Sequence, residues 1–291
     1  MKNNLIFGTA KMGIKGYSTA SNNLVENNSE ILNFLNKKDI LKLDTAERYG
    51  ESHKIIGQYN RSSNNPFNVS TKIDNLQIND KNVINRLIEF TKKSIETLNI
   101  NKLDVLYLHQ SDMKIISDPY ILDGLMELKS KNLVRSIGIS IYDETELEFG
   151  IESELFDCIQ LPINLYDSYL YDKYVSKYKG DKIKFIGRSI FFRGYLFKNH
   201  SLPFEKFTDF SLYSKINELI KSLDTDLSYL TMSFLKEKVK LNSTIFSSSS
   251  THNINNIISL NNTKKFEIPE KLLNLSSKYK TWGDLRKVKN I

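Results

Sequence analysis

Eight short apolar runs recur along the chain, separated by longer segments that mix apolar and polar residues. Short continuous apolar runs are typical of strands buried in a parallel sheet. The pattern therefore predicts eight strands, at residues 5–8, 40–44, 67–72, 103–109, 134–140, 156–161, 183–188 and 243–246.

The segments between these runs place apolar residues three or four positions apart, which is the spacing of one face of a helix. In the longest segment Val83, Leu87, Thr91 and Leu98 follow this spacing. Ser29 opens the first segment, and we expect it to cap that helix. The predicted helices cover residues 29–37, 52–59, 80–98, 119–131, 143–150, 168–178, 212–223, 226–239 and 252–260.

Strand-like and helix-like segments alternate without a linker or a shift of composition. Two stretches, 60–66 and 191–211, are expected to be loops, and a glycine-rich turn follows the first strand at 8–16. That turn lacks both the G-x-G-x-x-G pattern and an adjacent Gly-Lys-Ser/Thr. Eight parallel units in this length predict an α/β protein folded as a (β/α)8 TIM barrel, with residues 1–291 as a single domain.

Composition narrows the classes of protein. The hydrophobic content is 40%, and the single cysteine, Cys158, excludes an internal disulfide. The apolar run at 5–8 is too short for a signal peptide, and no apolar stretch reaches the roughly 18 residues that span a bilayer. We expect a soluble, cytoplasmic protein with no membrane partner. The net charge is +7, but lysines are interspersed with acidic residues. This favours a small anionic ligand over nucleic acid.

Polar residues end successive predicted strands. Asp44, Lys72 and His109 end the second, third and fourth strands, and Tyr49 follows Asp44 by five positions. The carboxyl ends of barrel strands meet at one mouth, where active sites lie. Taken one at a time, each residue also has a structural interpretation. Asp44 could cap the next helix, Tyr49 could pack on that helix, and His109 could make a structural hydrogen bond. Three such residues on successive strands favour a shared site.

These four residue types can protonate a carbonyl oxygen. A free tyrosine has a pKa near 10, and an adjacent ammonium stabilises its phenolate. Asp44 can pair with Lys72 and hold it against Tyr49, while His109 can donate a hydrogen bond that orients a carbonyl. The four histidines show no metal-ligand spacing, so we expect no metal, and no G-x-S-x-G elbow is present.

The chain resembles the aldo-keto reductase superfamily. The resemblance is carried by Asp44-Thr45-Ala46-x-x-Tyr49-Gly50-x-Ser52, by Ser70-Thr71-Lys72 and by Leu106-Tyr107-Leu108-His109. It implies an NADP(H)- or NAD(H)-dependent oxidoreductase that reduces a carbonyl, with Tyr49 as general acid. Lys72 and Asp44 would tune that acid, and His109 would orient the small-molecule substrate.

The resemblance also implies cofactor contacts. Gly138-Ile139-Ser140 matches the family pattern, although Ile141 stands where the family has an asparagine. Arg188, in Arg188-Ser189-Ile190-Phe191-Phe192, takes the place of an aromatic ring that stacks on the nicotinamide. Near Asn253 no basic residue for a 2′-phosphate is evident, so the choice between NADP and NAD stays open. The implied cofactor-binding residues are Thr9, Asp44, Ser140, Gln160, Arg188, Ser189, Ser247, Ser249 and Asn253.

The resemblance also indicates a substrate class, and two alternative functions stay open. Gly8-Thr9-Ala10-x-x-Gly13 and the segment at 188–191 resemble bacterial members associated with surface-sugar and polysaccharide pathways, which points to a keto-sugar, free or nucleotide-linked. One alternative is a non-catalytic nicotinamide-nucleotide-binding or redox-sensing module. The other is an isomerase or lyase that uses the same residues without nicotinamide. The sequence gives no oligomeric state.

Overall fold

The structure is a computed structural model, and it describes residues 4–14, 27–194, 196 and 210–278. Eight parallel strands form a closed barrel in which each strand pairs with the next in the sequence and β8 pairs with β1. The predicted (β/α)8 TIM barrel is therefore confirmed. The strands are β1 Leu5–Gly8, β2 Lys42–Asp44, β3 Asn68–Ile73, β4 Leu103–Leu108, β5 Val134–Ser140, β6 Cys158–Pro162, β7 Lys184–Arg188 and β8 Leu241–Phe246.

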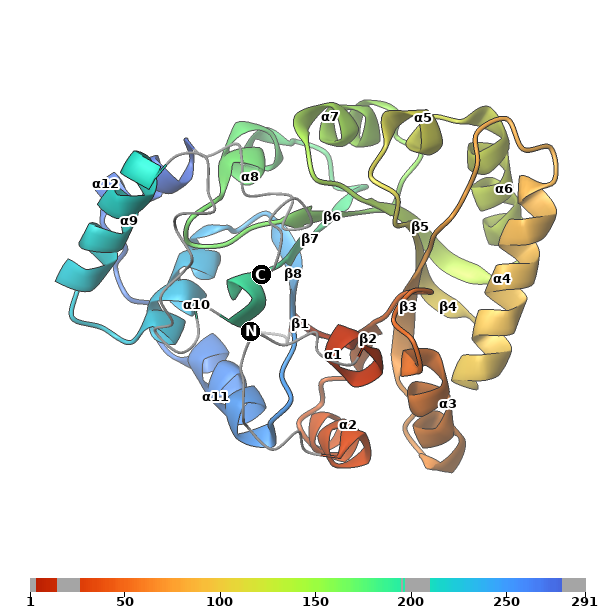
Figure 1. The fold of residues 1–291 in the computed structure, drawn as a ribbon, viewed down its shortest axis with the longest axis horizontal. Coiled ribbons are helices and arrows are strands. Elements are labelled where there is room, and N and C mark those ends of the chain that lie inside the picture. The colour runs from red at the N-terminus through yellow and green to blue at the C-terminus, as the bar shows by residue number, and fades with distance from the viewer. Residues whose placement is uncertain (1–3, 15–26, 195, 197–209, 279–291) are drawn as a thin grey trace.

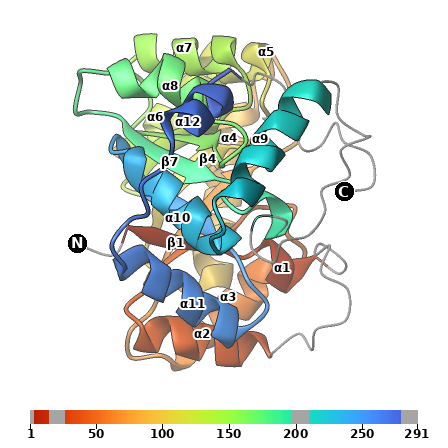
Figure 2. The same cartoon turned by 90° about the vertical axis from the view of Figure 1, so that its left-hand side faces the viewer.

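Helices surround this ring of strands (Figure 1). The later helices α9 to α12 cover the side of the barrel that faces the viewer in Figure 2. The helices are α1 Ala10–Gly13, α2 Asn28–Lys37, α3 Ser52–Ser62, α4 Val83–Leu98, α5 Met113–Ile116, α6 Pro119–Ser130, α7 Glu144–Glu152, α8 Tyr169–Lys173, α9 Phe210–Ser222, α10 Leu227–Glu237, α11 Thr251–Asn262 and α12 Glu270–Ser276, with 3-10 turns η1 Val175–Lys177 and η2 Phe192–Gly194.

The apolar residues divide into two layers because successive side chains on a strand point to opposite faces. On β4, Leu106 and Leu108 join the large cluster between barrel and helices, whereas Val105 and Tyr107 join a small cluster with Cys158, Ile186 and Ile245. A Cβ atom at Gly138 would lie 2.6 Å from the Tyr107 ring. The glycine on β5 therefore makes room for the largest side chain of this inner layer.

Several local predictions differ from the structure. Asn27, not Ser29, caps α2, and its side chain accepts a hydrogen bond from the Ser29 amide. The helix predicted at 168–178 is divided into α8 and η1, because Tyr174 interrupts it at φ −119°. The glycine-rich turn contains the short helix α1, and α12 was not predicted. Most of the loop predicted at 191–211 lies outside the described residues.

Strand register sets the height of the site in the barrel. Gly8, the last residue of β1, pairs with Asp44, the last residue of β2, and Asp44 in turn pairs with Ser70 in the middle of β3. Ser140, the last residue of β5, pairs with Gln160 in the middle of β6. In the described part of the chain, no helix is both long and apolar enough to cross a membrane.

Candidate active site

A buried ion pair forms the base of the site. The Lys72 ammonium contacts the Asp44 carboxylate and donates a second hydrogen bond to the Thr45 carbonyl at 3.0 Å. Only 3% of the Lys72 side chain and 6% of the Asp44 side chain are exposed. Burial lowers the pKa of Lys72 below its ordinary value, and the contact with Asp44 acts in the opposite direction. The two strand ends thus join as the sequence predicted.

Tyr49 and His109 lie over this pair. The Lys72 Nζ atom is 5.4 Å from the centroid of the Tyr49 ring. The rings of Tyr49 and His109 meet edge to face, with centroids 6.1 Å apart. An ammonium this close to a phenol favours the phenolate, which is what a phenol needs in order to release a proton. The structure therefore brings all four predicted catalytic residues together.

A second tyrosine, Tyr107, lies in the inner layer of the barrel and is fully buried. Burial raises the pKa of Tyr107 well above its ordinary value. This phenol therefore holds its proton, and Tyr49 is the better candidate for the acid.

The loop that carries Tyr49 is fixed by close backbone contact with the N-terminal segment. A Cβ atom at Gly13 would lie 1.7 Å from the Tyr49 carbonyl oxygen, and one at Gly50 would lie 2.4 Å from the Gly13 carbonyl oxygen. Gly50 also has φ +51°, a conformation that glycine adopts without strain. Glycines at both positions let the two segments touch and hold the tyrosine in place.

A chain of buried hydroxyl groups supports the same loop. Thr45 donates to Ser52, Ser52 donates to Thr9, and Thr9 donates to the Asp44 carbonyl at 3.1 Å. All three side chains have no exposed surface. The Thr9 hydroxyl, predicted to bind the cofactor, is thus directed at the protein backbone, which links β1 to the end of β2.

His109 is held by a residue that was not predicted. Its Nδ1 atom lies 2.5 Å from Asp74 Oδ2, and its backbone N–H donates to the Ile73 carbonyl. Burial lowers the pKa of His109, and the hydrogen bond to Asp74 acts in the opposite direction. The ring is therefore oriented by the segment that directly follows β3.

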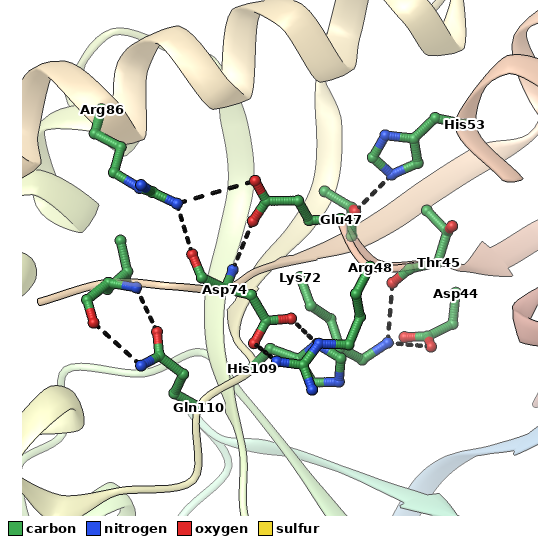
Figure 3. A network of polar contacts seen from close by, with 12 residues as sticks. Asp44, Thr45, Glu47, Arg48, His53, Lys72, Asp74, Arg86, His109 and Gln110 are labelled. Carbon is green, nitrogen blue, oxygen red and sulfur yellow. Dashed lines mark hydrogen bonds and ion pairs between the residues drawn. The ribbon is translucent and has the colours of Figure 1, made fainter. Parts of the chain in front are cut away.

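Asp74 lies at the centre of a polar network (Figure 3). Its other carboxylate oxygen accepts a hydrogen bond from Arg48 at 2.6 Å. Its backbone N–H donates to Glu47 and its carbonyl accepts from Arg86. Because Glu47 and Arg86 bind the main chain, and Arg48 precedes Tyr49, this network ties the tyrosine loop to the end of β3.

Two further side chains brace the strand ends. Gln110 binds both the N–H and the carbonyl of Leu76. His53 Nε2 lies 2.9 Å from the Thr71 hydroxyl, on the strand position next to Lys72. Burial, and then the charge of Lys72, lowers the pKa of His53 to about 4. His53 is therefore an uncharged structural residue.

Gln160 and Ser140, both predicted to bind the cofactor, lie side by side on neighbouring strands. They are paired in register on β6 and β5, and both are buried. Gln160 Nε2 donates to Asp44 Oδ2 at 2.6 Å, whereas its Oε1 atom has no hydrogen-bond partner among the described residues. A buried acceptor without a donor is costly, so a ligand amide would fit here.

Arg188, at the end of β7, lies over the ring of another side chain. Its guanidinium carbon is 4.0 Å from the Tyr142 ring centroid, and the guanidinium donates to the Ile141 carbonyl at 2.7 Å. The Nε atom is buried without a partner among the described residues. The next residue, Ser189, has φ +60° and starts the turn that leads into η2. A planar group held in this way can stack on a ring.

The remaining predicted cofactor residues lie at the junction of β8 and α11. Ser247 and Ser249 follow the strand, and Asn253 is in the first turn of the helix. A Cβ atom added at Gly8 would lie 3.8 Å from the Cβ atom of Ser247. The junction therefore lies beside β1. TIM barrels often bind phosphate at a helix N-terminus that follows strand 7 or 8.

Asp74, Arg48 and Tyr142 are not among the residues predicted from the sequence. Asp74 directly follows β3, two positions after Lys72, so its place as a polar residue at a strand end could have marked it. That signal was available. The contact of Tyr142 with Arg188 joins residues 46 positions apart and leaves no local pattern. Among the described residues, no group of three or more His, Cys, Asp or Glu is placed to hold a metal ion.

Comparisons with known proteins agree with this architecture. The sequence matches the model of the aldo/keto reductase family over residues 4–271, so the chain belongs to this family. Family and fold together indicate an oxidoreductase that acts on small-molecule carbonyls with a nicotinamide cofactor. A search of the curated proteins finds none that matches this chain.

Two solved structures show the similarity of fold. The holo form of aldo-keto reductase AKR11C1 from Bacillus halodurans superposes with a TM-score of 0.75 at 17% identity, covering 94% of this chain and 91% of that one. The glycerol dehydrogenase AKR11B4 from Gluconobacter oxydans superposes with a TM-score of 0.68 at 15% identity, with coverages of 94% and 90%. At these identities the likeness concerns the fold.

Proposed function

We propose that this chain is an NAD(P)H-dependent reductase that converts an aldehyde or a ketone into an alcohol, with Tyr49 as the general acid. One observation carries the proposal. A buried lysine, held by Asp44, lies 5.4 Å from the centroid of the Tyr49 ring, and the His109 ring lies nearly perpendicular to the same ring. A structural tyrosine has no need of a desolvated cation beside it.

The four residues have distinct roles in this proposal. Tyr49 gives its proton to the carbonyl oxygen as negative charge develops there. Lys72 stabilises the phenolate that remains, Asp44 keeps the ammonium in place, and His109 positions the substrate oxygen. A bound nicotinamide supplies the hydride.

In this proposal the cofactor binds at the same mouth of the barrel as the four catalytic residues. Gln160 and Ser140 would hold the carboxamide, and the open Gln160 acceptor supports this assignment. Arg188, supported by Tyr142, would stack on the ring, with Ser189 beside it. Ser247, Ser249 and Asn253 would bind the phosphates, and Thr9 would act through the backbone of Asp44. Whether the protein prefers NADP or NAD stays open.

The proposed substrate is a class of compound and not a single molecule. A keto-sugar, free or nucleotide-linked, is the substrate that we propose to test first, because of the bacterial sugar-pathway resemblance at residues 8–13 and 188–191. The cytoplasmic location and the extent of a single domain over residues 1–291 stay predictions.

The decisive experiment compares the wild type with Tyr49→Phe on a panel of aldehydes and keto-sugars, with NADPH and with NADH. We expect kcat to fall by about 10²- to 10⁴-fold in the variant, because general acid catalysis contributes that much. Cofactor affinity, measured by fluorescence titration, should not change. Tyr59→Phe is a matched control, because Tyr59 packs on Phe67 at the side of the barrel. Equal rates in wild type and Tyr49→Phe would contradict the proposal.

The same experiment separates the alternatives. Cofactor binding without turnover of any carbonyl by the wild type would favour a non-catalytic, redox-sensing module. Failure to bind either dinucleotide would favour an isomerase or lyase.

A further inference from the structure

Asp74 is a buried carboxylate with two different partners. Its side chain is 1% exposed. One carboxylate oxygen accepts a hydrogen bond from the Arg48 guanidinium at 2.6 Å, and the other lies 2.5 Å from Nδ1 of His109. Arg48 is on the loop after β2, and His109 directly follows β4. Asp74 therefore joins two of the elements that carry the catalytic groups.

The position of one hydrogen atom follows from these contacts. A guanidinium can only donate, and a neighbouring cation favours the charged form of a carboxylate. An ionised carboxylate has no hydrogen to give. The hydrogen between Asp74 and His109 therefore belongs to the imidazole, on Nδ1.

We propose that Asp74 is a positioning residue that fixes His109 as the Nδ1-protonated tautomer, so that the uncharged ring presents a lone pair at Nε2. In this form Nε2 accepts a hydrogen bond and cannot donate one. It can donate only when the ring is an imidazolium. This refines the sequence-based expectation that His109 donates to a carbonyl.

The consequence for turnover rests on the proposed reductase function. A carbonyl oxygen has only lone pairs, so it matches the imidazolium, whereas a hydroxyl group matches the uncharged ring. Protonation of His109 would then favour binding of the carbonyl, and loss of that proton would favour binding of the alcohol. The titratable groups that face the ring are Asp74, Lys72, Arg48 and Tyr49. His109 itself makes and breaks no bond to carbon.

A spectroscopic experiment tests the tautomer without cofactor or substrate. The full chain is labelled with ¹⁵N-histidine, and long-range ¹H–¹⁵N spectra are recorded at pH 8. The His109 signals are assigned from their loss in His109→Gln. We expect a pyrrole-type nitrogen shift at Nδ1 and a pyridine-type shift at Nε2 in the wild type. The reverse pattern in the wild type would overturn the proposal.

Asp74→Asn supplies the second comparison. Because Arg48 can only donate, the new amide oxygen should stay on Arg48, and the amide NH₂ should then face Nδ1. We expect the two nitrogen shifts of His109 to exchange. Glu47→Gln is the matched control, because Glu47 binds the Asp74 main chain and can still do so as glutamine. An unchanged tautomer in a folded Asp74→Asn variant would also overturn the proposal. If that variant does not fold, the wild-type spectrum still decides.

Kinetics add a readout that a purely structural role would not move. For carbonyl reduction, kcat/KM of the wild type should fall about tenfold per pH unit above the pKa of His109, as for loss of one essential proton. Asp74→Asn should remove this dependence, and Glu47→Gln should retain it. A wild type without turnover but with the expected tautomer would refute the reductase proposal and support the role of Asp74.

Discussion

Lys72 and Asp44 form an ion pair that solvent barely reaches, at the meeting point of β2 and β3. Buried pairs of this kind contribute little net stability, but each charge becomes costly when its partner is removed. The pair therefore constrains both residues together, because the Lys72 ammonium beside Tyr49 is retained only with its carboxylate.

The first prediction concerns this coupling. Asp44→Leu and Lys72→Met should each lower the free energy of unfolding by about 3–5 kcal/mol, because each leaves one unpaired buried charge. The double variant should recover most of the loss. Urea unfolding of the four proteins gives the interaction energy. Additive losses in the double variant would show that the pair is not coupled.

The second prediction concerns the contact between Gly13 and the tyrosine loop. Gly13→Ala places a methyl group where the Tyr49 carbonyl oxygen lies, so the loop must move. We expect a loss of about 1–3 kcal/mol in stability, as for overpacking, and a lower kcat. Met12→Leu, a swap of similar volume in the same helix, should cost under about 1.5 kcal/mol. A Gly13→Ala enzyme with wild-type kcat and stability would refute the importance of this contact.

The third prediction concerns His53 and acid stability. The pKa of His53 is about 4 in the folded protein, whereas an ordinary histidine, as in the unfolded chain, has a pKa of 6.5. Between these pH values the unfolded state therefore binds more protons than the folded state. Stability therefore rises with pH in this window and falls as the pH drops below about 6.5. From pH 7 to pH 5, His53 should account for about 2 kcal/mol of the loss.

Urea unfolding at both pH values measures this loss. His53→Gln should reduce the pH dependence, because glutamine does not titrate. His252→Gln, on the exposed side of α11, is the control and should behave as the wild type. The same pH dependence in His53→Gln and wild type would show that His53 is not responsible.

The fourth prediction concerns Arg188 and Tyr142. If the guanidinium that lies over Tyr142 also supports the nicotinamide ring, Arg188→Met should weaken cofactor binding by roughly tenfold, since cation–π and stacking contacts contribute about 1–2 kcal/mol. Arg188→Lys should weaken cofactor binding nearly as much, because an ammonium group is not planar and cannot stack on a ring. Fluorescence titration of the reduced cofactor measures both. Unchanged affinity in Arg188→Met would place the nicotinamide elsewhere.

Much of this architecture was predictable from the sequence for a physical reason. Strands covered on both faces read as apolar runs, and the closed barrel brings the ends of those runs to one mouth. Asp44, Lys72 and His109 can therefore be grouped from the sequence alone, and the structure brings them together with Tyr49. The barrel and the family are confirmed, while the catalytic and cofactor roles stay predictions.

The parts that could not be predicted depend on contacts between distant segments. Gly13 meets Tyr49 across 36 positions, and Arg188 meets Tyr142 across 46. Neither contact leaves a periodic pattern. The cap of α2 was misplaced by two residues because Asn27 and Ser29 are both good capping residues, and only the backbone shows which one accepts the hydrogen bond.

The N-terminal strand β1 has only four residues, but the closure of the whole barrel depends on it. β1 hydrogen-bonds to β2 on one side and to β8 on the other, and Gly8 is the pairing partner of Asp44. A chain shortened by this strand would open the ring and present two unpaired edges, which are surfaces through which proteins aggregate. It would also release the backbone of Asp44. A segment that carries none of the proposed catalytic side chains thus closes both edges of the ring and holds Asp44 in register.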